Sequence, residues 1–259
     1  MVMVFVPGGS MVIGSTDEAV TAVLSGCQAV RGAAGCQASW YEASRPPYPV
    51  TLNGYWLDRY TVTNRQYQLC VTAGPCQPPA TANNSWYGEP LYADYPVVNV
   101  TWHDAEAYCH WAEAVLPTEA QWEYGARGPQ AMLFPWGNEF EAGRANFCDG
   151  DCPHSWREVA DQDGFATLAP VGSYPAGSSW IGALDMAGNV WEWVSDWYAP
   201  YPTAPQQDPT GPAAGQERVL RGGSWTSNHW FLHSGYRRSA VSSSYNSDVG
   251  FRCVVPDPS

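Results

Sequence analysis

The chain has 259 residues, a formal net charge of -13 and only 14% charged residues, and all 12 basic residues are arginine. The absence of lysine excludes Schiff-base and pyridoxal chemistry and a Walker-type phosphate loop, because each of these requires a lysine. The negative charge argues against nucleic acid as a partner, and no segment reaches the length of a membrane span. With 14 Trp and 15 Tyr, the composition favours one domain, residues 1–259, with an aromatic core.

The expected strands are short and bounded by turns. Residues 1–15 predict a strand, a turn at Pro7-Gly8-Gly9 and a second strand, and residues 49–60 predict a strand or hairpin. After Gly128, frequent Gly, Pro, Asn and Asp leave room only for short strands such as 189–193 and 218–222.

Three helices are expected, each at a capping residue. Thr63 followed by Gln66 forms a capping box that opens a helix through about Cys70, and Thr118 with Gln121 opens another. Between them, residues 101–104 begin a helix whose residues Ala105, Tyr108, Cys109 and Ala112 recur at helical spacing on one face.

Eight cysteines without paired C-x-x-C motifs predict a disulfide framework. Three pairs bracket short loops, namely Cys27 with Cys36, Cys70 with Cys76, and Cys148 with Cys152; Cys109 and Cys253 then pair by elimination. Such a framework indicates a secreted or cell-surface protein, although residues 1–6 are too short for a signal-peptide core. The alternative is a cytoplasmic protein with reduced, buried thiols.

Several motifs carry a family resemblance. They include PGGSMVIGS at 7–15, YPVTLNGYWLDRYTVTNRQY at 48–67, LPTEAQWEYGARG at 116–128, GALDMAGNVWEWVSDWY at 182–198, VLRGGSW at 219–225 and GFRCV at 250–254. In this order they resemble the formylglycine-generating-enzyme-like (sulfatase-modifying factor) family of the C-type-lectin fold. The resemblance implies an α+β fold of small twisted antiparallel sheets, two or three short helices and much irregular structure. The long-range disulfide of the family also falls on Cys109 and Cys253.

The resemblance further implies structural calcium at two clusters of oxygen ligands. One site would use the side chains of Asn146 and Asp163 with the carbonyls of Phe147 and Phe165. The other would use Asp185 and Glu192 with the carbonyls of Gly188 and Val190. Carboxylate, amide and carbonyl oxygens suit Ca²⁺, a hard cation. The alternative is that these acidic side chains only cap turns.

One departure from the family concerns catalysis. Catalytic members carry two copper-binding cysteines after the Gly-Gly-Ser motif, and an ungapped alignment on residues 222–224 places Ser227 and Leu232 at these positions. Because Cu(I) prefers sulfur ligands, no copper is expected here.

Residues 226–248 combine aromatic and small polar side chains, as antibody paratopes do. The variable proteins of diversity-generating retroelements, a subclass of this fold, carry their diversified residues at the same position. The expected ligand-binding residues are Thr226, Ser227, Asn228, His229, Trp230, Phe231, His233, Tyr236, Arg238, Ser243, Tyr245 and Asn246. Among the aromatic residues, Trp230 is the one most expected in the core.

The leading hypothesis is therefore a non-catalytic protein that displays a variable surface to a protein or carbohydrate ligand. Two alternatives remain. One is a fixed binding or structural module, and the other is a formylglycine-generating-type oxidoreductase with a non-standard active centre.

Overall fold

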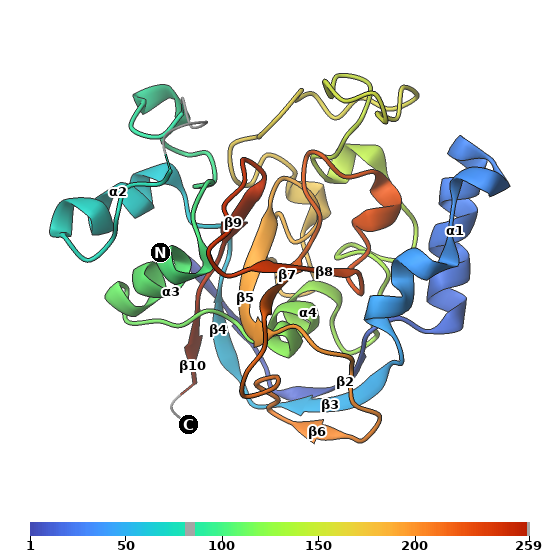
Figure 1. Ribbon diagram of the computed structural model, residues 1–259, viewed down its shortest axis with the longest axis horizontal. Helices are drawn as coiled ribbons and strands as arrows, with labels where there is room; N and C mark the ends of the chain where they lie inside the picture. Colours follow the sequence, from blue (N-terminus) through green and yellow to red (C-terminus); the bar gives the residue numbers. More distant parts are fainter. Residues whose placement is uncertain (81–85, 258–259) are drawn as a thin grey trace.

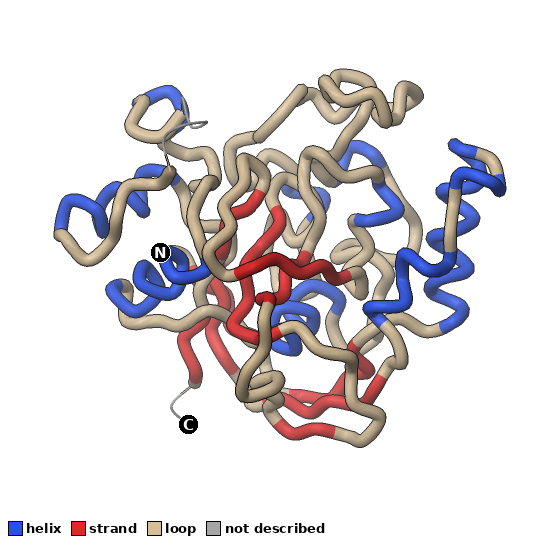
Figure 2. The backbone as a smooth tube through the Cα atoms, in the orientation of Figure 1, coloured by secondary structure: helices blue, strands red, loops and turns tan. Residues whose placement is uncertain are grey.

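The computed structural model describes residues 1–80 and 86–257. Three small sheets lie at its centre, with α1 on one side and α2 and α3 on the opposite side (Figure 1). Turns and loops make up much of the remaining backbone (Figure 2). The predicted α+β architecture of small sheets, few helices and much irregular structure is confirmed.

The sheets combine strands from distant parts of the chain. The first contains β1 (Met3–Val6), β4 (Tyr55–Asp58) and β10 (Val254–Pro256), and the second contains β2 (Gly9–Ile13), β3 (Tyr48–Leu52) and β6 (Gln206–Gln207). The third has the order β8 (Arg237–Val241), β7 (Glu217–Arg221), β5 (Trp191–Trp197) and β9 (Val249–Phe251). The predicted strand pairs at 1–15 and 49–60 therefore exist, but the two strands of each belong to different sheets. Most strand pairs are antiparallel, as expected, whereas β3–β6 and β5–β9 pair in parallel after long connections.

The three expected helices are present. They are α2 (Asn64–Ala73), α3 (Trp102–Trp111) and α4 (Glu119–Arg127), and each begins with a reciprocal capping box at Thr63, Thr101 or Thr118. These boxes satisfy backbone N–H groups that a helix N-terminus leaves unpaired. Short 3₁₀ turns complete the helical content at Ala33–Gly35 (η1), Ala38–Ser44 (η2), Pro90–Tyr92 (η4), Ala142–Arg144 (η5), Pro175–Gly177 (η6) and His229–Phe231 (η7).

A fourth helix, α1 (Asp17–Arg31), was not predicted from the sequence. Thr16 caps it by accepting a hydrogen bond from the backbone N–H of Ala19, and Val20, Val23 and Cys27 face the interior. The short loop expected between Cys27 and Cys36 overlaps the last turn of this helix, because α1 continues to Arg31. The buried residues nevertheless follow helical spacing, so the signal was present.

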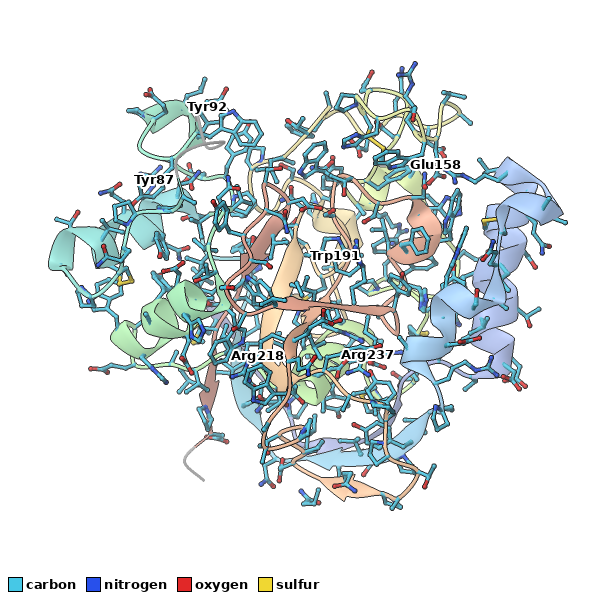
Figure 3. All side chains as sticks on the ribbon, viewed as in Figure 1. Tyr87, Tyr92, Glu158, Trp191, Arg218 and Arg237 are labelled. Carbon is cyan, nitrogen blue, oxygen red and sulfur yellow. A yellow bond between two sulfur atoms is a disulfide. The ribbon has the colours of Figure 1, made fainter. Side chains whose placement is uncertain are left out.

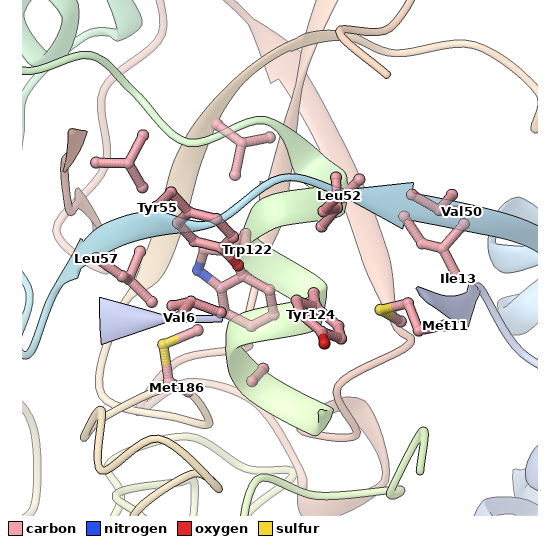
Figure 4. Close-up of a cluster of buried hydrophobic side chains, with 14 of the residues drawn as sticks. Val6, Met11, Ile13, Val50, Leu52, Tyr55, Leu57, Trp122, Tyr124 and Met186 are labelled. Carbon is pink, nitrogen blue, oxygen red and sulfur yellow. The ribbon is translucent and has the colours of Figure 1, made fainter. Parts of the chain in front are cut away.

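One large apolar cluster surrounds α4, where Trp122 is fully buried and packs with Tyr124, Val6, Leu52 and Leu57 (Figure 4). A second cluster joins α2 and α3 to the central sheet through Tyr67, Tyr108, Trp193 and Phe251. Helix α4 therefore lies inside the protein, which explains why nearly all of its side chains are buried.

All four predicted disulfides are confirmed. Cys27 bonds to Cys36, Cys70 to Cys76, Cys109 to Cys253, and Cys148 to Cys152. The Cys109–Cys253 bond attaches α3 to the end of the chain, and Cys27–Cys36 closes the loop after α1. Within the described ranges, no helix has both the length and the apolar character needed to cross a bilayer.

Two glutamates of α4 hold a buried network of ion pairs. Glu119 pairs with Arg221 at 3.0 Å and with Arg237 at 2.7 Å, while Glu123 pairs with Arg221 at 2.6 Å and with Arg127 at 2.8 Å. All five side chains are buried. The network connects α4 to the end of β7 and the start of β8, and so fixes both ends of residues 222–236.

Asp196 lies beside this network. Its carboxylate accepts hydrogen bonds from the backbone N–H of Glu119 at 2.8 Å and from the Ser195 hydroxyl at 3.1 Å. Burial, with a further contribution from the Glu119 carboxylate, raises the pKa of Asp196 to about 7.

Removing the Cys109–Cys253 disulfide should destabilise the protein more than removing Cys70–Cys76. The first closes a separation of 144 residues and the second one of 6, so the chain-entropy relation gives losses of about 5 and about 2 kcal/mol. Urea unfolding of the two double Cys→Ser variants measures the difference. Equal losses would show that unfolded-state entropy does not set the contribution of either bond.

The free energy of unfolding should fall between pH 4 and pH 7 because of Asp196. In this window the folded carboxyl retains a proton that the unfolded chain has released, so a rise in pH favours unfolding. Asp196→Asn should remove this part of the decline, by up to a few kcal/mol. Asp94→Asn, at an exposed aspartate that pairs with Arg65, is the control. Parallel stability–pH curves for wild type and Asp196→Asn would contradict the assignment.

Candidate ligand-binding cavity

Between β7 and β8 the chain turns sharply at Gly222 and Gly223, whose φ angles are 96° and 76°. A side chain at Gly223 would meet Leu232 at 2.4 Å, so the close packing here requires glycine. The segment that follows forms one wall of a surface cavity of about 470 Å³. Six of the predicted ligand-binding residues line it: Thr226, Ser227, Asn228, Phe231, Tyr236 and Arg238.

The other walls come from four other segments. Arg31 ends α1, Trp40 belongs to η2, Trp156 lies in the loop after Cys152, and Trp191 begins β5. Trp191 lies near the crossing of β5 and β8 in Figure 3. Only Trp191 falls within one of the family-like motifs, and nothing in the local sequence indicated that the other three lie at this cavity.

Hydrogen bonds hold the walls together. The indole N–H of Trp156 donates to the carbonyl of Thr226 at 2.9 Å, and the Asn228 side-chain amide donates to the carbonyl of Trp156 at 2.9 Å. Arg31 donates to the same carbonyl at 3.1 Å. The ring of Phe231 lies 5.3 Å from that of Trp40. The two loops and α1 therefore support one another around the cavity.

Three predicted ligand-binding residues point away from this cavity. His229 pairs through Nδ1 with the buried carboxylate of Glu158 and stacks on Phe140, with ring centres 4.4 Å apart. Trp230 is fully buried in the cluster that contains the Cys27–Cys36 disulfide. His233 is 1% exposed, and burial lowers its pKa well below the ordinary value.

The prediction that Trp230 and His233 contact ligand is therefore corrected, because their burial gives them structural roles. The expectation of a core position for Trp230 is confirmed.

Ser243, Tyr245 and Asn246 are also separate from the cavity. They follow β8 and are exposed, but none of them lines the cavity. The carbonyl of Asn246 accepts a hydrogen bond from the backbone N–H of Asn99 at 3.0 Å, which holds this turn against a different loop. The predicted binding face thus divides in two, and only residues between 226 and 238 contribute to this cavity.

The positions of the two family cysteines differ in their surroundings. Ser227 lines the cavity, and its hydroxyl accepts a hydrogen bond from the backbone N–H of Ser224 at 3.1 Å. Leu232 is fully buried and packs with Phe134 and Phe147. All eight cysteines of the sequence are in disulfides, so no thiolate is available at the cavity.

The first predicted calcium cluster contains a buried oxygen without a partner. Asn146 donates through Nδ2 to the carbonyl of Thr167 at 2.8 Å, while its Oδ1 has no donor among the described residues. Asp163 accepts from the backbone N–H groups of Phe147 at 2.7 Å and Phe165 at 2.9 Å. A buried acceptor beside a carboxylate and backbone carbonyls is consistent with a hard cation.

The second predicted calcium cluster fits a cation less well. The two oxygens of Glu192 accept hydrogen bonds from Arg252, both at 2.7 Å, and one also accepts from Trp122 at 2.8 Å. Asp185 accepts from the backbone N–H of Gly172 at 2.7 Å. The carboxylate of Glu192 is thus neutralised by an arginine. Across residues 1–80 and 86–257, no group of three or more His, Cys, Asp or Glu side chains is arranged to hold a metal.

Comparison with known proteins identifies relatives along most of the chain. The family described as the sulfatase-modifying factor enzyme 1-like domain matches residues 1–256. The formylglycine-generating enzyme of Streptomyces coelicolor is 44% identical over 187 residues, which are 68% of this chain and 56% of that protein. The mouse protein named inactive C-alpha-formylglycine-generating enzyme 2 is 38% identical over 169 residues, or 62% of this chain and 49% of its own. The chain spans about half the length of the curated relatives it matches.

Two solved structures resemble this one over nearly its whole length. PvdO from Pseudomonas aeruginosa has a TM-score of 0.73 at 27% identity and covers 97% of this chain and 93% of its own. Treponema denticola variable protein 1 has a TM-score of 0.71 at 23% identity, with 98% and 95% covered.

Proposed function

Because the chain belongs to the sulfatase-modifying factor enzyme 1-like family, as the sequence motifs predicted, we propose that it is a binding member of that family that takes a ligand in the cavity beside η7. The observation that carries the proposal is that the cavity lacks the copper-binding cysteines of the family and has an aromatic lining. Ser227 and Leu232 stand where copper-binding cysteines are expected, and the cavity is lined instead by aromatic rings. Rings of this kind supply large contact area at a low cost in conformational entropy.

The surroundings of the cavity support a rigid binding site. Phe231, Tyr236 and Tyr41 form one aromatic group, with ring centres 5.1 to 6.3 Å apart. The Cys27–Cys36 disulfide lies directly beneath, next to Trp230. A preformed site loses little affinity to the ordering of loops. The residues of segment 226–248 that line the cavity are the ones we expect to vary if the protein is diversified.

The second candidate function is a formylglycine-generating-type oxidoreductase with a non-standard centre. The identity of 44% to a formylglycine-generating enzyme favours it. That activity would require a redox centre other than a Cu(I)–thiolate pair, since every cysteine is bonded. Oxygen consumption with a cysteine-containing peptide, together with copper or iron that remains bound on purification, would favour the enzyme over the binding protein.

We also propose one structural Ca²⁺ ion, at the cluster of Asn146, Asp163 and the carbonyls of Phe147 and Phe165. The unpaired buried Oδ1 of Asn146 supports it. The second cluster is a weaker candidate, because Arg252 already neutralises Glu192.

Calcium should raise the melting temperature relative to EDTA, because a ligand bound only to the folded state stabilises it by about 2.7 kcal/mol at 100 times its Kd. Asn146→Ala should abolish this calcium-dependent difference. Asp185→Asn, which changes only the second cluster, should retain it. A difference that persists in Asn146→Ala and disappears in Asp185→Asn would move the ion to the second cluster. Equal melting temperatures with no calcium in elemental analysis would refute the proposal.

Aromatic side chains of the cavity, of the exposed turn after β8 and of the core should respond differently to replacement by alanine. Phe231→Ala should remove binding of neutral aromatic fragments, measured by saturation-transfer NMR, and lower the free energy of unfolding by about 1–2 kcal/mol because the ring is half-buried. Tyr245→Ala, outside the cavity, should change neither by more than about 0.5 kcal/mol. Trp193→Ala should cost about 3–5 kcal/mol, since this side chain is fully buried. Unchanged fragment binding in Phe231→Ala would refute the cavity as the binding site.

A further inference from the structure

Two arginines line the cavity and no acidic residue does, although the chain has a net charge of -13. Arg238 is exposed on β8, and its guanidinium carbon lies 5.4 Å from the centre of the Trp191 ring. In the part of the chain that the structure describes, Arg238 makes no ion pair. Its positive charge is therefore free to act on a ligand.

Arg31 is held in place by neutral groups. It donates to the carbonyl of Trp156 at 3.1 Å and to the side-chain oxygen of Asn228 at 3.3 Å. Neither acceptor carries a charge, so neither of them neutralises the positive charge of the guanidinium. The neighbouring acids have other partners, because Glu158 pairs with His229 and Asp248 accepts from Ser224 and Thr226.

Most of the remaining polar groups of the cavity are closed to a ligand or already bonded. The indole N–H of Trp191 is buried and has no acceptor among the described residues. Asn228 uses both side-chain ends, one toward Trp156 and one toward Arg31. The Thr226 hydroxyl is bonded to Asp248 at 2.9 Å. What the cavity offers a ligand is thus the positive charge and N–H donors of two arginines, the hydroxyl of Tyr236 and the apolar faces of aromatic rings.

We propose that the cavity binds a small molecule that carries an oxyanion, a carboxylate or a phosphate, on a flat apolar body. This inference rests on the proposed binding function and adds the chemical class of the ligand. Arginine guanidinium groups match the geometry of oxyanions, and aromatic rings accommodate a flat body. The volume of about 470 Å³ lies within the range of small-molecule sites. A cationic ligand would face two uncompensated guanidinium groups.

Isothermal titration calorimetry of the full chain with four probes of similar shape tests the proposed chemical class of the ligand. The probes are 2-naphthoate, 2-naphthyl phosphate, 2-naphthamide and 2-naphthylmethylammonium. The naphthoate or the phosphate should bind at least about tenfold more tightly than the amide, since charge-assisted hydrogen bonds are about twice as strong as neutral ones. The ammonium probe should not bind. Whichever anion binds more tightly identifies the oxyanion.

Arg238→Gln and Arg31→Gln should each weaken anion binding about tenfold and weaken amide binding less, because an oxyanion accepts stronger hydrogen bonds from a guanidinium than a neutral carbonyl does. Arg65→Gln is the matched control, because Arg65 lies on α2 and pairs with Asp94 away from the cavity. Circular dichroism and melting temperatures establish that each variant is folded. Anion affinity that is the same in Arg238→Gln, Arg31→Gln and Arg65→Gln would overturn the proposal.

Two results would separate this inference from the proposed function. Equal affinity for acid and amide, lost in Phe231→Ala, would refute the anionic class and leave the binding cavity in place. Absence of saturable binding by either anion would also overturn the proposed class, while binding of neutral fragments would still test the cavity itself.

Discussion

The constraint on which the cavity depends is the buried charge of α4. Glu119 and Glu123 are one helical turn apart and face the interior, where an uncompensated carboxylate would be strongly unfavourable. Arg221 and Arg237 neutralise them, and these two arginines are the residues at which the chain leaves β7 and enters β8. The segment between them, which supplies much of the cavity wall, is therefore fixed at both ends to one helix. Arginine suits this role because its planar group bonds several acceptors at once, including the carbonyl of Ser234.

Local signals in the sequence were sufficient to predict α2, α3 and α4, which begin with capping boxes. Thr63 and Thr118 form the expected boxes with the residue three places later, because all partners lie within one turn, and Thr101 forms a further box with Asp104. Disulfides across short loops were predictable for the same reason. Helix α1 was missed because Ala19, three places after its cap Thr16, has no side chain that could complete a capping box. The pairing of strands could not be predicted locally, since β5 and β9 meet only after the long connection between them has folded.

The candidate site was predictable only in part, because core and cavity residues alternate along one short segment. Asn228 and Phe231 line the cavity, whereas Trp230 and Leu232 lie beneath it in the core. The 3₁₀ turn η7 places neighbouring residues on different sides, and composition alone does not distinguish them. Arg31, Trp40 and Trp156 reach the cavity through tertiary packing, which no motif of the sequence encodes. The paired carboxylates of α4 were overlooked because acidic residues are usually exposed.

The contrast between the charge of the chain and that of the cavity affects how a ligand would bind. At physiological ionic strength the Debye length is about 8 Å, so the negative surface is screened from a distant anion and Arg31 and Arg238 act only near the cavity. Little electrostatic steering is then expected, and the association rate should be ordinary for a neutral encounter. Discrimination must come from contacts made at the cavity itself, where two guanidinium groups lie beside aromatic rings. A ligand with charge but no apolar body would lose most of the contact area with Trp40, Phe231 and Tyr236. One with an apolar body but no charge would leave the donors without acceptors, so both features are needed for selectivity.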